Sequence, residues 1–172
     1  MTDEEELYGI DRAHGHPRAI ELIPDEFFWD CADELGPFGS DEGDTALEEF
    51  REWRLDHPGE PVEDCIVWTI EAVGEMDASE YADDIANEET VAELMDDEDF
   101  DDQQYIYTLD ISVIATGFGQ LADEGRIDPE AKPYVARALK RQIVYAKLST
   151  DWEHADQYIA NLRKLEQVLQ QA

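Results

Sequence analysis

The longest regular pattern of apolar residues lies between residues 104 and 122. One apolar stripe recurs at intervals of three and four residues, and a second stripe runs beside it through Ile106, Leu109 and Val113. Such spacing marks one face of an α-helix, and two adjacent stripes leave little polar surface. We therefore predict that this segment is a helix at the centre of the core. The first stripe consists of Tyr107, Ile111, Ile114, Phe118 and Leu121.

Two more helices are predicted after this central one. Residues 133–148 form the first, and the second opens on Thr150-Asp-Trp-Glu153, which has the form of a capping box. Within the central helix, Gly117 and Gly119 are expected to allow neighbouring helices to pack closely. The apolar face of the last helix consists of Ala155, Tyr158, Ile159, Leu162, Leu165 and Leu169.

The first half of the chain shows shorter helical patterns. A short helix is predicted from Pro24 to the Gly36-Pro37 break, and a longer one from about Thr45 to Leu55. Residues 61–74 alternate poorly as a strand, whereas a helix places their apolar residues at spacings of three and four, so helix is favoured. In that helix Val67 and Trp68 would widen the apolar face and leave the helix buried on most sides.

The assembled elements predict an all-α fold. Ser79 and Asn87 are candidate N-caps for two short helical pieces that follow residue 74. We expect a single-domain bundle of about six to eight helices over residues 19–172, preceded by a loosely ordered acidic and polar leader at residues 1–18. The chain shows no secretory signal or apolar run of membrane-spanning length, which predicts a cytoplasmic protein. Cys31 and Cys65 are then expected to be buried free thiols.

Charge changes this picture more than any other property. The formal net charge is −33, and residues 1–102 hold 36 of the 45 acids but only four of the 12 Lys and Arg residues. Such a charge argues against direct binding to nucleic acid or to an anionic membrane. The excess has two explanations: hydration of the surface in a salty environment, or a directed field that attracts cations or a basic protein partner. Among the basic residues, Arg137, Lys140, Arg141 and Lys147 share one predicted helix and are expected to face the acidic half or to remain solvated.

The stretch GPFGSDEGDTALEEFREWR, residues 36–54, offers a candidate site. Asp41, Glu42 and Asp44 cluster between glycines, which suggests a divalent-cation site of low specificity. The register of a calcium-binding EF-hand fails, because with Gly43 at the sixth loop position the first ligand would be Phe38. The alternative is structural: Ser40, Asp41 and Asp44 can cap the free N–H groups at a helix start, where the helix dipole favours acids.

A second acidic pattern suggests an enzyme. Glu48-Glu49-Phe-Arg-Glu52 and Glu80-Tyr-Ala-Asp83 resemble the E-E-x-x-E and E-x-x-D motifs of MazG-like nucleotide pyrophosphohydrolases. The resemblance implies magnesium bound by Glu49, Glu52, Glu80 and Asp83. A chain with 45 acids produces such spacing by chance, however, and Glu49 and Glu52 lie off the apolar face of their predicted helix.

Three segments resemble one family of small, uncharacterised bacterial proteins. HPRAIELIPDEFFWD, ELGPFGSDEGDTALEEFREWR and GEPV are similar to the YfeS-like family, with PFGSDEGDTAL as the most specific motif. The resemblance implies a bacterial-type cytoplasmic protein and supplies no catalytic residue or cofactor.

From the sequence, the favoured function is non-enzymatic binding. The acidic N-terminal half is expected to contact a basic protein or cations. The alternatives are a magnesium-dependent hydrolase using the four residues named above, and an acidic protein that mimics nucleic acid.

Overall fold

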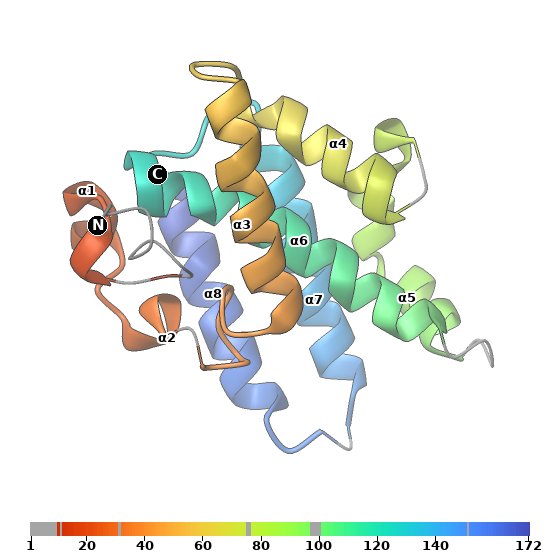
Figure 1. The fold of residues 1–172 in the computed structure, drawn as a ribbon. Coiled ribbons are helices and arrows are strands. Elements are labelled where there is room, and N and C mark those ends of the chain that lie inside the picture. Colours follow the sequence, from red (N-terminus) through yellow and green to blue (C-terminus); the bar gives the residue numbers. More distant parts are fainter. Residues whose placement is uncertain (1–9, 11, 31, 75–76, 97–100, 151) are drawn as a thin grey trace.

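The structure is a computed structural model, and it describes residue 10 and residues 12–30, 32–74, 77–96, 101–150 and 152–172. These residues form helices and turns and contain no strand, which confirms the predicted all-α fold. Figure 1 shows the helices gathered around one central helix, α6. The α-helices are α1 (Pro17–Leu22), α2 (Glu26–Trp29), α3 (Asp41–Asp56), α4 (Val62–Gly74), α5 (Glu88–Asp96), α6 (Asp101–Glu124), α7 (Lys132–Leu148) and α8 (Ala155–Gln171).

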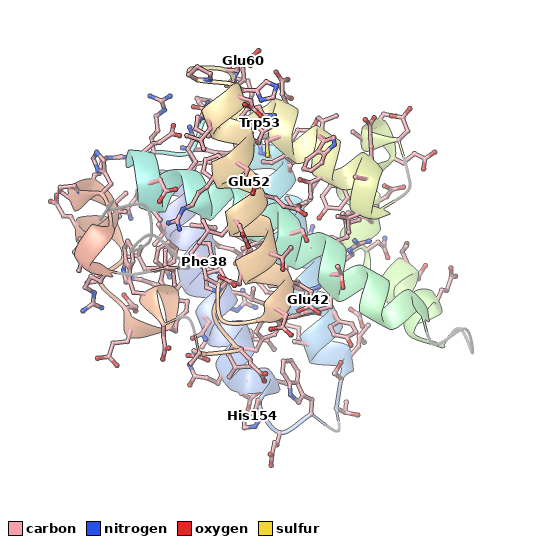
Figure 2. All side chains as sticks on the ribbon, in the orientation of Figure 1. Phe38, Glu42, Glu52, Trp53, Glu60 and His154 are labelled. Atoms are coloured by element: carbon pink, nitrogen blue, oxygen red, sulfur yellow. The ribbon has the colours of Figure 1, made fainter. Side chains whose placement is uncertain are left out.

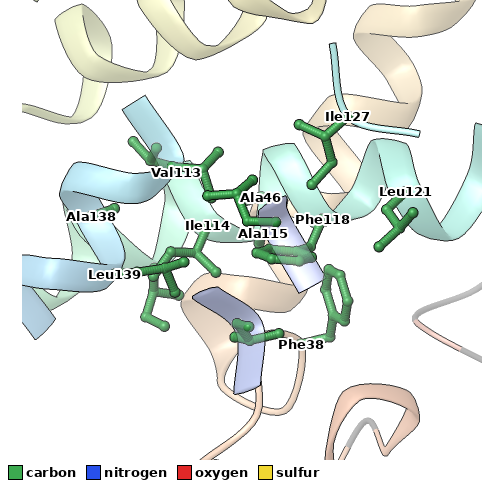
Figure 3. Packing of buried hydrophobic residues seen from close by; sticks show 14 of the residues in the cluster. Phe38, Ala46, Val113, Ile114, Ala115, Phe118, Leu121, Ile127, Ala138 and Leu139 are labelled. Atoms are coloured by element: carbon green, nitrogen blue, oxygen red, sulfur yellow. The ribbon is translucent and has the colours of Figure 1, made fainter. Parts of the chain in front are cut away.

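Helix α6 is the central core element that its two apolar stripes predict. Every residue from 109 to 122 is buried, and α6 packs against α3, α4 and α7. Figure 3 shows side chains of these elements meeting in the core, among them Ala46, Phe118 and Leu139. The two glycines of α6 are sites of close approach, as predicted. A Cβ atom on Gly117 would lie 2.4 Å from a Val135 methyl group of α7, and one on Gly119 would lie 3.0 Å from Leu47 of α3.

Helix α4 resolves the ambiguous segment, residues 61–74, in favour of helix. Val62, Cys65, Ile66 and Ile70 lie on its buried face. The expectation that Trp68 would widen this buried face is wrong, because 48% of its surface is exposed. The neighbouring helix α6 covers one side of α4 only, so a residue on the opposite side meets solvent.

The boundaries of α2 and α3 also differ from the sequence patterns. Helix α2 ends at Trp29, well before the predicted end at Gly36. The indole N–H of Trp29 donates to the Ile23 carbonyl (2.7 Å). Helix α3 begins at Asp41, because Ser40 caps it: the Ser40 hydroxyl accepts from the Gly43 N–H (3.1 Å).

The predicted capping box at Thr150–Glu153 is wrong. Helix α8 begins only at Ala155, and its N-cap residue His154 makes no side-chain capping bond. The Trp152 ring packs instead against Tyr158, with 5.2 Å between ring centroids, so this segment turns before the helix starts. Of the two predicted N-caps after residue 74, Asn87 accepts from the Glu89 N–H (2.9 Å), whereas Asp77 rather than Ser79 caps Ala78–Glu80.

A buried polar network crosses the core at Asp110, in the middle of α6. The Arg141 guanidinium donates two hydrogen bonds to the Asp110 carboxylate, each 2.8 Å long. The hydroxyl of Tyr81 (2.6 Å) and the side-chain amide of Gln142 (3.0 Å) donate to the same carboxylate. Tyr158 of α8 then donates to the Gln142 side-chain oxygen (2.7 Å). This network joins α6, α7, α8 and the segment that follows α4.

The N-terminal part of the described chain is fastened to the ends of two long helices. The guanidinium of Arg18 donates to the Gly125 carbonyl (2.7 Å) after α6 and to the Gln171 carbonyl (2.8 Å) of α8. A cation is favoured at these positions because the helix dipole is negative at the C-terminal end. The predicted division of the chain at residue 18 stays a prediction, since residues 1–9 and 11 lie outside the described part.

Removing one partner of the buried Asp110–Arg141 pair should strongly destabilise the bundle. Replacing Arg141 by Met leaves a buried carboxylate without its counter-charge, which should lower the free energy of unfolding by about 3–5 kcal/mol. The control is Lys140→Met, an exposed position on the same helix, which should change it by no more than about 0.5 kcal/mol. Urea denaturation followed by circular dichroism measures both, and equal losses would contradict the assigned role of Arg141.

Cys65 should be chemically inert in the folded protein. It is 1% exposed, and burial, assisted by the charge of Glu49, raises the pKa of its thiol from 9.0 to about 12. Because the thiolate is the reactive form, a thiol reagent at pH 8 should modify a Cys31→Ser variant only after unfolding in urea. The folded state holds the Cys65 thiol proton more tightly than the unfolded state does. The resulting contribution to the free energy of unfolding is therefore fully present below pH 9 and is lost as the pH rises toward 12. Equal labelling rates with and without urea would refute this.

Candidate functional site

An open cleft of about 810 Å³ lies beside the N-terminal end of α3. Its walls come from the loop before α3, the first turn of α3, helices α6, α7 and α8, and the turn between α7 and α8. Figure 2 shows Glu42 and His154 at this end of the molecule, whereas Trp53 and Glu60 lie at the opposite end. The lining residues are Ala32, Asp33, Glu34, Leu35, Ser40, Asp41, Glu42, Tyr107, Tyr145, Ser149, Trp152, His154 and Tyr158.

Aromatic side chains form one part of the cleft lining. Tyr107, Tyr145 and Tyr158 come from three different helices, and Trp152 packs against Tyr158. Burial raises the pKa of Tyr158 well above its ordinary value, and the nearby Tyr107, Asp110 and Tyr145 raise it further. Burial also raises the pKa of Tyr145. These phenols are therefore uncharged at neutral pH and present ring faces and hydroxyl groups.

Carboxylates form the second part of the lining. Glu34 and Asp33 come from the loop, and Asp41 and Glu42 come from the first turn of α3. The pKa of Tyr107 is raised, first by burial and then by the charges of Glu42 and Glu34, while a hydrogen bond with Ser40 opposes the rise. The two glutamates therefore act on the same phenol from different segments. Among the described residues, no Lys or Arg lines the cleft, and the one histidine in this lining, His154, is exposed.

The structure gives the residues of the PFGSDEGD motif a local structural role. Ser40 caps α3, and Asp41, Glu42 and Asp44 lie in the first turn of the helix, where the dipole favours acids. Gly43 lies against the chain before the helix, since a Cβ atom there would be 2.1 Å from the Pro37 carbonyl oxygen. A side chain larger than hydrogen would therefore disturb the helix start.

The three acids proposed as metal ligands are only partly brought together. Asp41 and Glu42 line the cleft, whereas Asp44 does not. Within the described residues, no group of three or more His, Cys, Asp or Glu side chains is arranged to hold a metal ion. A divalent-cation site at this cluster stays a prediction.

Three of the four residues of the hydrolase pattern, Glu49, Glu52 and Glu80, lie outside the cleft. Glu49 and Glu52 are exposed on α3, and Glu80 is exposed in the turn Ala78–Glu80 after α4. Burial and the charges of Glu52 and Glu48 raise the pKa of Glu49. Asp83 begins the turn Asp83–Ala86, and its side chain is not among those described. A hydrolase based on these residues stays a prediction.

Sequence reasoning missed the aromatic part of the cleft and the polar centre of the core. Tyr107 and Tyr158 fit apolar helix faces, which predicts core positions for both, while the spacing of apolar residues gives Asp110 no role. The available signal was that tyrosines carry a polar group at the edge of an apolar face. Their convergence depends on how α6, α7 and α8 pack, which spacing along the chain does not reveal.

The chain is similar to an uncharacterized protein, YfeS, of Escherichia coli strain K12, with 32% identity over 148 residues. The aligned part covers 85% of this chain and 57% of YfeS, so the chain spans little more than half the length of this relative. No family model matches the chain, and no solved structure does. None of the described helices is long and apolar enough to cross a membrane. The similarity to YfeS supports the family resemblance indicated by the sequence, and the chain is YfeS-like.

Proposed function

We propose that this protein binds a basic segment of a partner protein through the acidic and aromatic cleft. The observation that carries the proposal is the lining itself. In the part of the chain that the structure describes, four carboxylates and four aromatic rings share one concave surface, and no Lys or Arg lines it. Carboxylates attract a cationic group through their charge. Aromatic rings add a cation–π attraction, because the face of each ring carries a partial negative charge.

The arginines of the acidic half support the proposal, because each of them interacts within the protein. Arg51 pairs with Asp123 (2.9 Å), and Arg54 pairs with Glu124 (2.8 Å). Arg18 donates to helix-terminal carbonyls, and Arg12 donates to the Pro24 carbonyl. Two of these four arginines thus neutralise acids of α6, from the second part of the chain. The negative charge of the cleft is left for an external cation.

The similarity to YfeS adds no activity, because that relative is uncharacterized. Among the described residues, the carboxylates of the cleft lie beside neutral phenols, and no nucleophile there is activated by a neighbouring base. This lining supports binding in preference to catalysis. We therefore place the function in recognition of a basic protein surface.

A cationic peptide should bind in a way that depends on salt and on the first turn of α3. A ten-residue peptide of alternating Arg and Gly serves as the probe in isothermal titration calorimetry at 50 and 500 mM NaCl. The affinity should fall as salt rises, because the attraction is partly screened. The double variant Asp41→Asn, Glu42→Gln should weaken binding at low salt by about two- to fivefold.

The matched control is Glu88→Gln, Glu89→Gln. These two acids also lie in the first turn of a helix, α5, where both are exposed, but they do not line the cleft. The control removes the same charge and the same interaction with a helix dipole, but outside the cleft. It should therefore lose less affinity for the peptide than the cleft variant does. Equal losses would show that net charge alone attracts the peptide and would contradict the cleft as the contact.

A further inference from the structure

We propose that the group recognised in the cleft is the guanidinium of an arginine side chain from the partner. This inference rests on the proposed function and specifies its chemistry. It follows from an arrangement that the protein builds internally: an arginine held between an aromatic face and a carboxylate.

Arg54 shows the first instance. Its guanidinium carbon lies 5.2 Å from the centre of the Trp53 ring and 5.8 Å from that of Phe50. The same guanidinium donates to both carboxylate oxygens of Glu124, at 2.8 and 3.2 Å. The aromatic rings come from α3 and the carboxylate from α6, so the arginine joins two helices.

Arg141 shows the second instance, in the core. Its guanidinium carbon lies 5.5 Å from the centre of the Tyr81 ring, and two of its nitrogen atoms donate to Asp110 at 2.8 Å each. Here the hydroxyl group of Tyr81 also donates a hydrogen bond to the carboxylate of Asp110. Tyrosine, carboxylate and guanidinium thus form one compact unit.

The cleft presents two of these three components. Tyr107 lines the same cleft as Glu34 and Glu42, and Trp152 adds a larger ring next to Tyr158. The missing component is the cation, since neither Lys nor Arg is found among the described residues that line this surface. A cleft of about 810 Å³ is large enough for an arginine side chain and part of its flanking backbone.

Arginine fits this lining better than lysine. Its planar guanidinium stacks on an aromatic face and donates two parallel hydrogen bonds to one carboxylate, and it is less strongly hydrated than an ammonium group. Glu34 and Glu42 reach the cleft from separate segments, so the donors on different edges of a guanidinium can each meet a carboxylate. The spherical ammonium of lysine gains less from such an arrangement.

The test compares three small probes in nuclear magnetic resonance titrations that follow the indole N–H signals. The probes are the N-acetyl amides of arginine, lysine and citrulline; citrulline has nearly the shape of arginine but no charge. The arginine amide should bind at least about threefold more tightly than the lysine amide, and the citrulline amide should bind weakest. Equal affinity for the arginine and lysine probes would overturn the inference.

Two variants locate the site. Trp152→Leu should weaken binding of the arginine amide by about two- to fivefold, and Glu42→Gln should do the same without removing a packed ring. The controls are Trp68→Leu and Glu89→Gln, at exposed positions that do not line the cleft. If the cleft variants bind as tightly as their controls, the guanidinium does not bind in the cleft.

A last comparison separates this inference from the proposed function. The two probes are a five-residue peptide with one central arginine flanked by glycines, and free arginine. If the natural ligand is an arginine of a partner protein, the cleft should also accommodate the flanking backbone, and the peptide should bind more tightly. Tighter binding of free arginine would support the guanidinium site but contradict the protein partner. Salt-dependent binding of the alternating peptide, without preference for arginine over lysine, would support the partner and overturn the guanidinium.

Discussion

The ion pair between Asp110 and Arg141 constrains the whole bundle, because a carboxylate at the centre of the most buried helix is tolerable only when it is fully hydrogen-bonded. Asp110 is 0% exposed, and it receives donors from α7 and from Tyr81. These donors fix how α7 lies along α6 and hold the segment after α4 against both. We infer that this carboxylate favours the one helix register that brings its donors together, which a purely apolar core would not do.

The same network reaches the candidate site through α8. Tyr158 donates to Gln142, which donates in turn to Asp110, and the ring of Tyr158 lines the cleft beside Trp152. The aromatic side of the cleft is therefore placed by the core. The acidic side is placed differently, by the Ser40 cap that starts α3 at Asp41. The cleft forms where these two local arrangements meet.

Much of the fold could be predicted from the sequence because helices leave a local signal. The stripes of residues 104–122 identify the central helix, and Asn87 is recognisable as an N-cap. The start of α8 was mispredicted because the Thr150–Glu153 pattern competes with a tertiary contact, the packing of Trp152 on Tyr158. Spacing along α4 likewise could not reveal that Trp68 faces solvent, since this depends on which neighbours cover the helix.

The candidate site was only half predictable for the same reason. The stretch around Asp41 and Glu42 stands out locally. Its aromatic counterpart is spread over three helices and the turn between α7 and α8, and it looks like ordinary core residues. Tyr158 shows what this placement means for binding. Its hydroxyl is already hydrogen-bonded and its ring is 2% exposed, so its conformational entropy was lost when the chain folded. A ligand that enters the cleft meets a preorganised wall there and need not order this side chain at its own expense.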